Sequence, residues 1–146
     1  ELLIDSQTVK EKAFLVACGN ASQYGNNAFI APHANIQDGK MDITILSPFG
    51  PLDIAPLAIQ LFTKQIDRNS KIKTFKGKEV TIIRQNPGVM HLDGEPIMAD
   101  SRIEISVLPK SLNVLTPETV SFTEEVQNLF GEVTRFFDKK LPYIFR

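Results

Sequence analysis

Short apolar segments of β-strand length, separated by turn residues, are the feature that most constrains how this chain can fold. They are rich in β-branched and aromatic residues, and Gly, Pro, Asn or Asp interrupts them. Strands are expected at residues 12–18, 28–31, 42–46, 72–75, 79–84, 89–92 and 103–107. Strands this short and this closely spaced favour a sandwich or a barrel. We therefore predict a mainly β fold, an antiparallel β-sandwich.

Two segments depart from the β pattern and repeat their apolar residues at helical spacing. Between residues 51 and 67, Asp53 can cap the start and Pro56 falls in the first turn, so one inserted helix is expected there. A capping-box sequence at 121–124 precedes an apolar stripe that ends at Leu141. We expect a β-sandwich domain over 1–115 and a helical extension over 116–146, a long C-terminal helix.

Size, charge and cysteine content limit the classes of function. A chain of 146 residues with 42% hydrophobic content can form one core and not two full domains. A net charge of −1, no Trp and only 2 Tyr disfavour nucleic acid as a partner. The single cysteine, Cys18, lies in an apolar run typical of a buried small hydrophobe, and one cysteine favours a reducing, cytoplasmic setting. No apolar run is long enough to span a bilayer.

Several common sites are missing from the sequence. None of the 8 glycines forms a G-x-G or Walker pattern, so the chain is not expected to hold ATP by itself. His33 and His91 stand alone, which argues against a zinc site. No Ser lies in a G-x-S-x-G elbow, so a hydrolase is set aside.

Two acidic turns carry the main functional signal: Asp38-Gly39-Lys40-Met41-Asp42 and Asp93-Gly94-Glu95-Pro96. A carboxylate beside a glycine can approach a metal, a phosphate or a hydroxyl unobstructed, as phosphoryl transfer requires. Asp-Gly is also a common hairpin turn. Taken alone, the two turns leave both interpretations open.

In its wider setting the first turn resembles a family signature. Ala31-Pro32-His33-Ala34 followed by Asp38-Gly39-Lys40-Met41-Asp42 resembles the A-P-x-A-x-x-x-D-G-x-x-D pattern of diacylglycerol, sphingosine and ceramide kinases. Four more segments resemble motifs of that family in the same order. Upstream, Asn20 resembles its asparagine and Tyr24-Gly25-Asn26-Asn27 its Y-G-G-G loop. Downstream, Leu92-Asp93-Gly94-Glu95-Pro96 resembles its D-G-E motif and Leu108-Pro109-Lys110-Ser111-Leu112 its closing strand. Asn26 and Asn27 replace two family glycines, and Asn tolerates the left-handed backbone better than other side chains. The match covers about residues 1–115, the family's C-terminal, lipid-accepting β-sandwich.

The resemblance implies the substrate-binding and catalytic-completion domain of an ATP-dependent lipid kinase for a diacylglycerol-like or sphingoid alcohol. Glu95 is expected as the base that accepts the hydroxyl proton, or as its close support, and Asp93 as a group that helps to hold Mg²⁺ or orients the loop. The resemblance also implies a structural divalent cation, with a side-chain oxygen from Asp38 and a backbone carbonyl from Lys40. ATP would be bound by a G-G-D-G-T half that this sequence lacks. Because the chain begins at Glu1 and not at Met, we expect a fragment, and without the nucleotide-binding half we expect it to be inactive alone.

Other interpretations stay open. A basic stretch could face anionic lipid headgroups, but the solvated face of an edge hairpin is favoured: Lys71, Lys73, Lys76, Lys78 and Arg84. Apolar strand residues could line an acyl-chain site, although most are expected to fill the core: Phe29, Ile30, Ile43, Ile45, Ile82, Ile103 and Ile105. The main competitor is a non-catalytic β-sandwich that binds a lipid or a protein, and a kinase half for a soluble nucleotide ranks last. Peripheral contact with the inner membrane face and a homo-oligomer are both compatible with the sequence.

Overall fold

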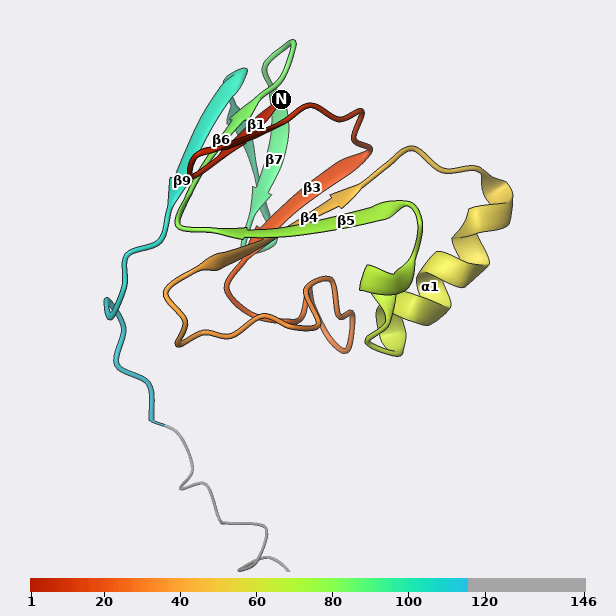
Figure 1. Ribbon diagram of the computed structural model, residues 1–146, viewed down its shortest axis with the longest axis horizontal. Helices are drawn as coiled ribbons and strands as arrows, with labels where there is room; N and C mark the ends of the chain where they lie inside the picture. The colour runs from red at the N-terminus through yellow and green to blue at the C-terminus, as the bar shows by residue number, and fades with distance from the viewer. Residues whose placement is uncertain (116–146) are drawn as a thin grey trace, which may run out of the picture. The chain divides into compact units, whose positions relative to one another are not determined.

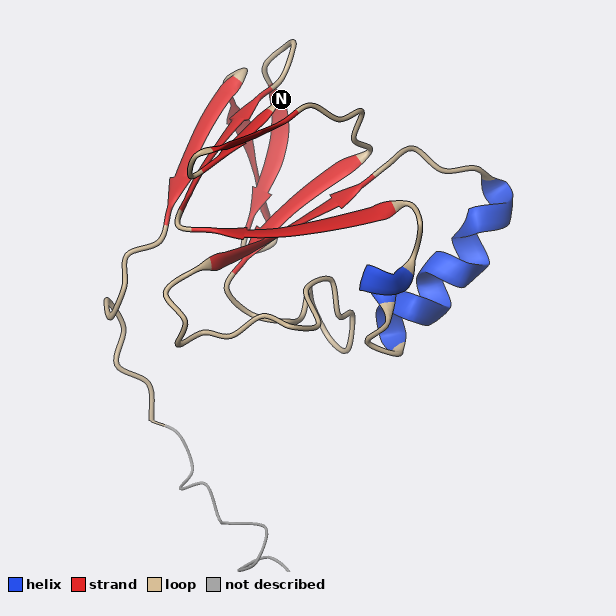
Figure 2. Cartoon of the chain, viewed as in Figure 1, coloured by secondary structure: helices blue, strands red, loops and turns tan. Residues whose placement is uncertain are grey.

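The computed structural model describes residues 1–115 (Figure 1). Residues Glu1–Ser111 form one compact unit, which contains all the strands and helices described below. In the described residues all strand pairs are antiparallel, and a single α-helix lies to one side of the sheets (Figure 2). This confirms a mainly β, antiparallel fold with one inserted helix. The long C-terminal helix lies outside the described residues, and the boundary at 115/116 stays a prediction.

Three sheets make up the β part of this unit. The four-stranded sheet has the order β2 (Gln7–Val9), β1 (Leu2–Ile4), β6 (Glu79–Ile83), β9 (Arg102–Ser106). The three-stranded sheet has the order β3 (Leu15–Gly19), β4 (Met41–Leu46), β5 (Ile72–Gly77). The third sheet is a hairpin of β7 (Gly88–Leu92) and β8 (Glu95–Ala99).

The apolar faces of the two larger sheets form one core. Buried residues of β1, β2 and β6 cluster with β4: Leu2, Ile4, Val9 and Val80 with Met41, Ile43 and Ile45. Because side chains alternate along a strand, β4 turns Asp42 and Thr44 to the opposite face of its sheet. Ile43 and Ile45 are fully buried, as expected of core residues rather than of an acyl-chain site. A polar second face of the three-stranded sheet follows from the same alternation.

Two 3-10 helices and α1 cover part of that second face. They are η1 (Pro51–Asp53), α1 (Ile54–Phe62) and η2 (Ile66–Arg68), so the expected helix over 51–67 is α-helical only in its middle. A second apolar cluster joins them to the sheet through Leu57, Ile66 and Ile72. The Asp53 carboxylate accepts the Gly50 N–H at 2.9 Å, so it closes the 3-10 turn and does not cap α1.

Two expected strands are absent. Residues 28–31 form a loop, because their polar backbone groups pair with other elements: Phe29 N–H donates to the Leu61 carbonyl at 3.0 Å, and the Thr44 hydroxyl donates to the Ile30 carbonyl at 2.9 Å. Residues 108–112 form a turn in which the Ser111 hydroxyl donates to the Leu108 carbonyl at 2.9 Å. The prediction was wrong at both places, since strand-like composition does not supply a strand partner.

The basic stretch was expected on an edge hairpin, but β5 and β6 belong to different sheets, and β6 is an inner strand between β1 and β9; only the edge position of β5 is confirmed. β5 is an edge strand of its sheet, and Lys71, Lys73 and Lys76 are each paired with a carboxylate, on Asp53, Glu11 and Asp38 respectively. Arg84 differs from these three lysines, because its guanidinium binds backbone carbonyls. Cys18 is half-buried, and desolvation raises the pKa of its thiol to about 11, which supports the view that it is no nucleophile.

Candidate functional site

The second acidic turn lies at the tip of the β7–β8 hairpin. Leu92 pairs with Glu95, so Asp93 and Gly94 form a two-residue turn, with φ of 50° and 94°. Positive φ at both central residues is typical of a hairpin turn whose twist matches the strands. Asp93 and Glu95 are both exposed, and neither accepts a hydrogen bond from another side chain within residues 1–115. The fold therefore presents two free carboxylates at the end of a projecting hairpin.

Arg84 holds the root of this hairpin. Its guanidinium donates to the carbonyls of Gly88 at 2.7 Å and Ala99 at 2.6 Å, and more weakly to those of Val89 at 3.4 Å and Asp100 at 3.1 Å. Gly88 and Ala99 are the opposing residues at the open end of the hairpin. The five N–H donors of an arginine in a rigid fork suit such a cluster of carbonyls. Arg84 thus connects the acidic turn to the four-stranded sheet through β6.

The first acidic turn precedes β4 and closes on itself. Gly39 has a φ of 66°, and Lys40 N–H donates to the Asp38 carboxylate at 2.9 Å. This backbone hydrogen bond, together with the nearby Lys76 ammonium, holds the pKa of Asp38 below its usual value. Asp38 and Lys40 are exposed. Unlike the second turn, this one is not flanked by two strands.

Lys76 of β5 joins this turn to the polar face of the sheet. Its Nζ lies 3.2 Å from Asp38 Oδ2, 3.2 Å from Asp42 Oδ2 and 3.1 Å from the His33 carbonyl. Desolvation alone would lower the pKa of Lys76, but its contacts with Asp42 and Asp38 raise it. Asp42 is 8% exposed, and its Oδ2 makes no hydrogen bond of good geometry, so the ion pair with Lys76 is its main compensation.

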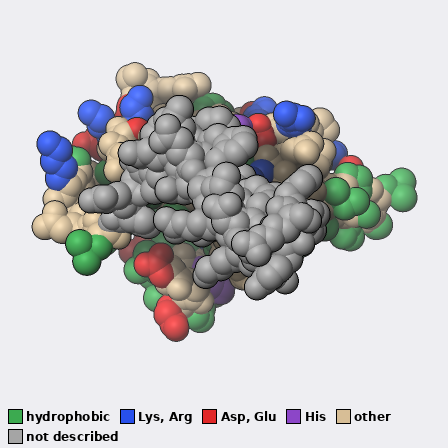
Figure 3. Space-filling view, turned by 90° about the horizontal axis from the view of Figure 1, so that it is seen from below, with side chains coloured by type: hydrophobic (Ala, Val, Ile, Leu, Met, Phe, Trp, Pro, Cys, Tyr) green, Lys and Arg blue, Asp and Glu red, His purple; other side chains and the backbone are tan. Residues whose placement is uncertain are grey.

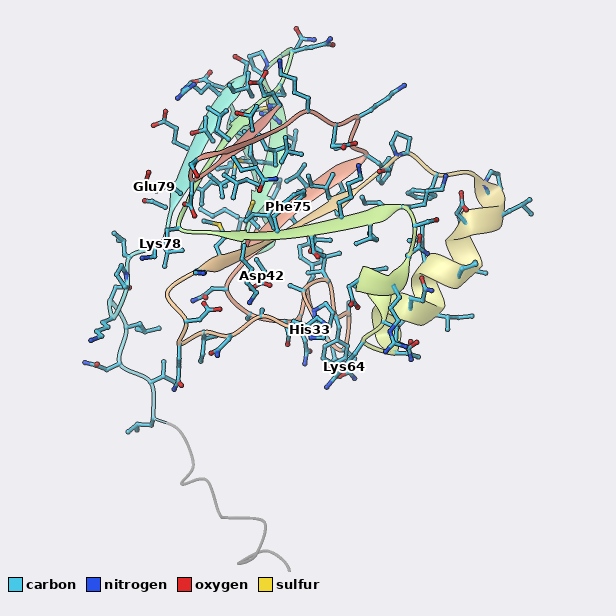
Figure 4. All side chains as sticks on the ribbon, in the orientation of Figure 1. His33, Asp42, Lys64, Phe75, Lys78 and Glu79 are labelled. Carbon is cyan, nitrogen blue, oxygen red and sulfur yellow. The ribbon has the colours of Figure 1, made fainter. Side chains whose placement is uncertain are left out.

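A cavity of about 230 Å³, with both polar and apolar lining, opens beside this ion pair. It lies on the face of β4 and β5 where Figure 4 labels Asp42 and His33. Its lining comes from the 31–33 loop, from β4 and β5 and from η2: Ala31, Pro32, His33, Asp42, Thr44, Asp67, Thr74, Phe75 and Lys76. His33 Nε2 is 3.3 Å from Asp67 Oδ2. Neither Asp93 nor Glu95 lines the cavity, so it does not contain the expected catalytic carboxylates.

The Asp38 turn offers little to a divalent ion. Residues 1–115 contain no group of three or more His, Cys, Asp or Glu side chains arranged to hold a metal. The one carboxylate expected to bind the ion is already paired with an ammonium, and Mg²⁺ and Ca²⁺ favour several oxygen ligands. The described residues fit an ammonium at this place better than a resident divalent ion. The ion at Asp38 and Lys40 stays a prediction, and no catalytic step is assigned to it.

Sequence reasoning identified the acidic turns but not their partners. Lys76 was interpreted only as part of an edge strand, and His33 and Asp67 were not linked, because each pair comes together across at least 34 residues of chain. The one available signal was the alternation in 42–46, which separates Asp42 from the core residues. It predicts a polar face but not what covers it.

Comparison with known proteins assigns the class. The antiparallel β fold is shared with the C-terminal domain of lipid-kinase-like proteins. A family model described as the YegS C-terminal NAD kinase beta sandwich-like domain matches residues 1–116. The chain belongs to this family.

Relatives and a solved structure agree with that assignment. The chain is 30% identical over 111 residues to "Probable lipid kinase YegS-like" of Pectobacterium atrosepticum, covering 75% of this chain and 35% of that protein. It is 29% identical over 113 residues to the protein of the same description in Shewanella frigidimarina, with coverage of 77% and 36%. The crystal structure of a putative diacylglycerol kinase from Bacillus anthracis strain Sterne superposes with a TM-score of 0.60 and 24% identity, over 74% of this chain and 34% of that one. The chain thus spans roughly a third of the length of these proteins.

Proposed function

We propose that this chain is the substrate-binding and catalytic-completion domain of an ATP-dependent lipid kinase that phosphorylates a diacylglycerol-like or sphingoid alcohol. The observation that carries the proposal is the Asp93-Gly94-Glu95 tip of the β7–β8 hairpin, whose carboxylates are exposed and without a side-chain partner in residues 1–115. Two carboxylates on a hairpin that Arg84 holds in place are suited to complete an active site whose other groups come from another part of the protein. Family membership supports the same role.

Glu95 is the proposed general base. As the substrate hydroxyl oxygen forms its bond to the γ-phosphorus of ATP, the bond to the bridging oxygen of ADP breaks, and the hydroxyl proton passes to the Glu95 carboxylate. Asp93 orients the turn or helps to hold the Mg²⁺ that accompanies ATP. Such an ion neutralises charge on the phosphates, and carboxylate oxygens are among its preferred ligands. The nucleotide itself would be held by a part of the protein outside these 146 residues.

A lipid substrate requires contact with a membrane surface, and α1 supports such contact. Its exposed side is apolar: Leu52, just before the helix, is 93% exposed, and Ile54, Ile59 and Phe62 are more than half exposed. Hydrophobic side chains gather at the right of Figure 3, where α1 lies. No described helix is long and apolar enough to cross a membrane. We therefore propose a cytoplasmic protein that binds the inner membrane face peripherally.

A soluble phosphate acceptor is the second candidate, and one observation favours it. The cavity beside Asp42 and Lys76 is lined by charged and hydroxyl side chains together with Ala31, Pro32 and Phe75, and its volume of about 230 Å³ is below the roughly 300–1,000 Å³ of most small-molecule sites. A lipid-sized apolar site would then have to be completed by another part of the protein.

The test is transfer of the ATP γ-phosphate by a protein that joins this chain to its nucleotide-binding half. Diacylglycerol and sphingosine are offered in detergent micelles, and a soluble nucleotide is offered in parallel. We expect Glu95→Gln to lower kcat at least a hundredfold, which corresponds to about 2.7 kcal/mol of transition-state stabilisation. Glu104→Gln is the matched control, because Glu104 is also exposed but pairs with Arg102 on β9.

Each outcome separates the candidates. Transfer to a lipid that is lost in Glu95→Gln and kept in Glu104→Gln supports the proposal. Transfer to the nucleotide alone favours the second candidate. A folded protein that transfers phosphate to none of the three excludes these acceptors and moves the non-catalytic binding module ahead. Phosphate transfer by the isolated chain would contradict the proposal that another part of the protein binds the nucleotide.

A further inference from the structure

One ammonium ion connects three oxygen atoms from separate segments at the first acidic turn. Lys76 Nζ lies 3.1 to 3.2 Å from the Asp38 carboxylate, the Asp42 carboxylate and the His33 carbonyl. The ammonium donates hydrogen bonds to the His33 carbonyl and to Asp38 Oδ2, and it forms an ion pair with Asp42 Oδ2. The loop before β4 is thereby attached to β5 by a single charge.

Asp42 makes a cation at this point necessary. Asp42 is 8% exposed, and its Oδ2 is buried without a well-aligned hydrogen bond. Asp42 stands directly opposite Lys76 in the β4–β5 register, so the strand pairing itself delivers the ammonium to the carboxylate. Within residues 1–115 Lys76 supplies the ion pair of Asp42, and a buried carboxylate that loses its counter-charge destabilises the folded state strongly. Some positive charge must therefore remain beside Asp42 and Asp38.

The same oxygens are the kind that a divalent ion would use. Carboxylates and carbonyls are the ligands of Mg²⁺ and Ca²⁺. A divalent ion on Asp38 Oδ2 would lie within a few ångströms of the ammonium, where like charges repel. Lys76 and a metal ion are therefore alternatives at this turn, and the geometry already places Lys76 there.

We propose that the Lys76 ammonium takes the place of a divalent cation at the Asp38-Gly39-Lys40 turn, so that this domain is stabilised there by a tethered charge and not by a dissolved metal ion. The inference rests on the ion-pair geometry and is independent of the proposed kinase function. It predicts that removing the lysine converts a metal-insensitive turn into a metal-binding one.

The experiment compares thermal unfolding of the 146-residue chain in MgCl₂, in CaCl₂, and in EDTA with NaCl of equal ionic strength, which controls for charge screening. The wild type is expected to melt at the same temperature in all three. Lys76→Met is expected to melt lower in EDTA and to regain part of the loss with either divalent ion. Lys73→Met is the matched control: Lys73 lies on the same strand and pairs with Glu11, so its loss should be small and metal-independent.

Further variants assign the effect to the turn. In the double variant Lys76→Met and Asp38→Asn, the recovery by divalent ions should disappear, and calorimetric titration should show Mg²⁺ binding to Lys76→Met only. If Lys76→Met does not fold, Lys76→Gln replaces it in every comparison. The proposal is overturned if the wild type gains as much melting temperature from MgCl₂ as the lysine variant does, or if the folded variant is no more sensitive to metal than the wild type.

Discussion

Replacing Arg84 by Met should loosen the hairpin that carries the expected catalytic carboxylates. The guanidinium is half-buried and donates two short hydrogen bonds, at 2.7 Å to the Gly88 carbonyl and at 2.6 Å to the Ala99 carbonyl, besides two longer ones. A hydrogen bond from a charged donor contributes about 1.5–3 kcal/mol. Counting only the two short bonds at the lower value, the variant should lose about 3 kcal/mol of local stability at the hairpin root.

Native-state hydrogen exchange measures this loss where it occurs. A change of about 3 kcal/mol in the opening free energy of β7 and β8 should accelerate exchange of their amides roughly a hundredfold. The exchange rates of amides in β4, in the three-stranded sheet, should change much less. In the joined protein the same variant should lower kcat, because Glu95 would no longer be held in one position.

Arg102→Met is the matched control. Arg102 is exposed and pairs only with Glu104, two residues away on the same strand, so exposed-pair energetics predict a loss below about 1 kcal/mol. The reasoning would be refuted if exchange in β7 and β8 rises by less than about threefold in Arg84→Met, or if the two variants accelerate it equally.

Two further changes probe the packing and charge of the fold. In Gly77→Ala the new Cβ would lie 2.6 Å from Ile4 Cγ2 in the core, so urea unfolding should show a loss of about 1–3 kcal/mol; Gly88→Ala, whose nearest neighbour is the Arg84 side chain at 3.6 Å, should cost much less. Asp5 accepts the N–H groups of Glu79 and Lys78, and these bonds lower its pKa. A depressed carboxyl pKa contributes stability that is present above the unfolded value of about 3.9 and is lost as the pH falls through the folded value. Melting temperatures should therefore fall more steeply below pH 4 in the wild type than in Asp5→Asn, and parallel curves would contradict this.

The alternation of apolar and polar residues predicted most of the strands, because this pattern depends only on residues that are neighbours in the sequence. Alternation in 42–46 and 103–107 needs only the two-residue period of a strand, and both segments pair as expected. Asn27 has a left-handed φ of 57°, a conformation that Asn tolerates better than other side chains. β1 and β2 were missed because strands of three residues are too short to show a period.

The tertiary structure decided which polar groups meet. The sequence by itself determined an antiparallel β fold, an inserted helix and two acidic turns, since these follow from periodicity and turn chemistry over a few residues. It did not determine that residues 28–31 pair with α1 and β4 as a loop, that Arg84 braces the hairpin, or that Lys76 lies between Asp38 and Asp42. Asp38 and Lys76 are 38 residues apart. The register of β4 against β5 sets Asp42 opposite Lys76, and the turn before β4 brings Asp38 to the same ammonium, because hydrogen bonds and ion pairs depend on distance in space and not on distance along the chain.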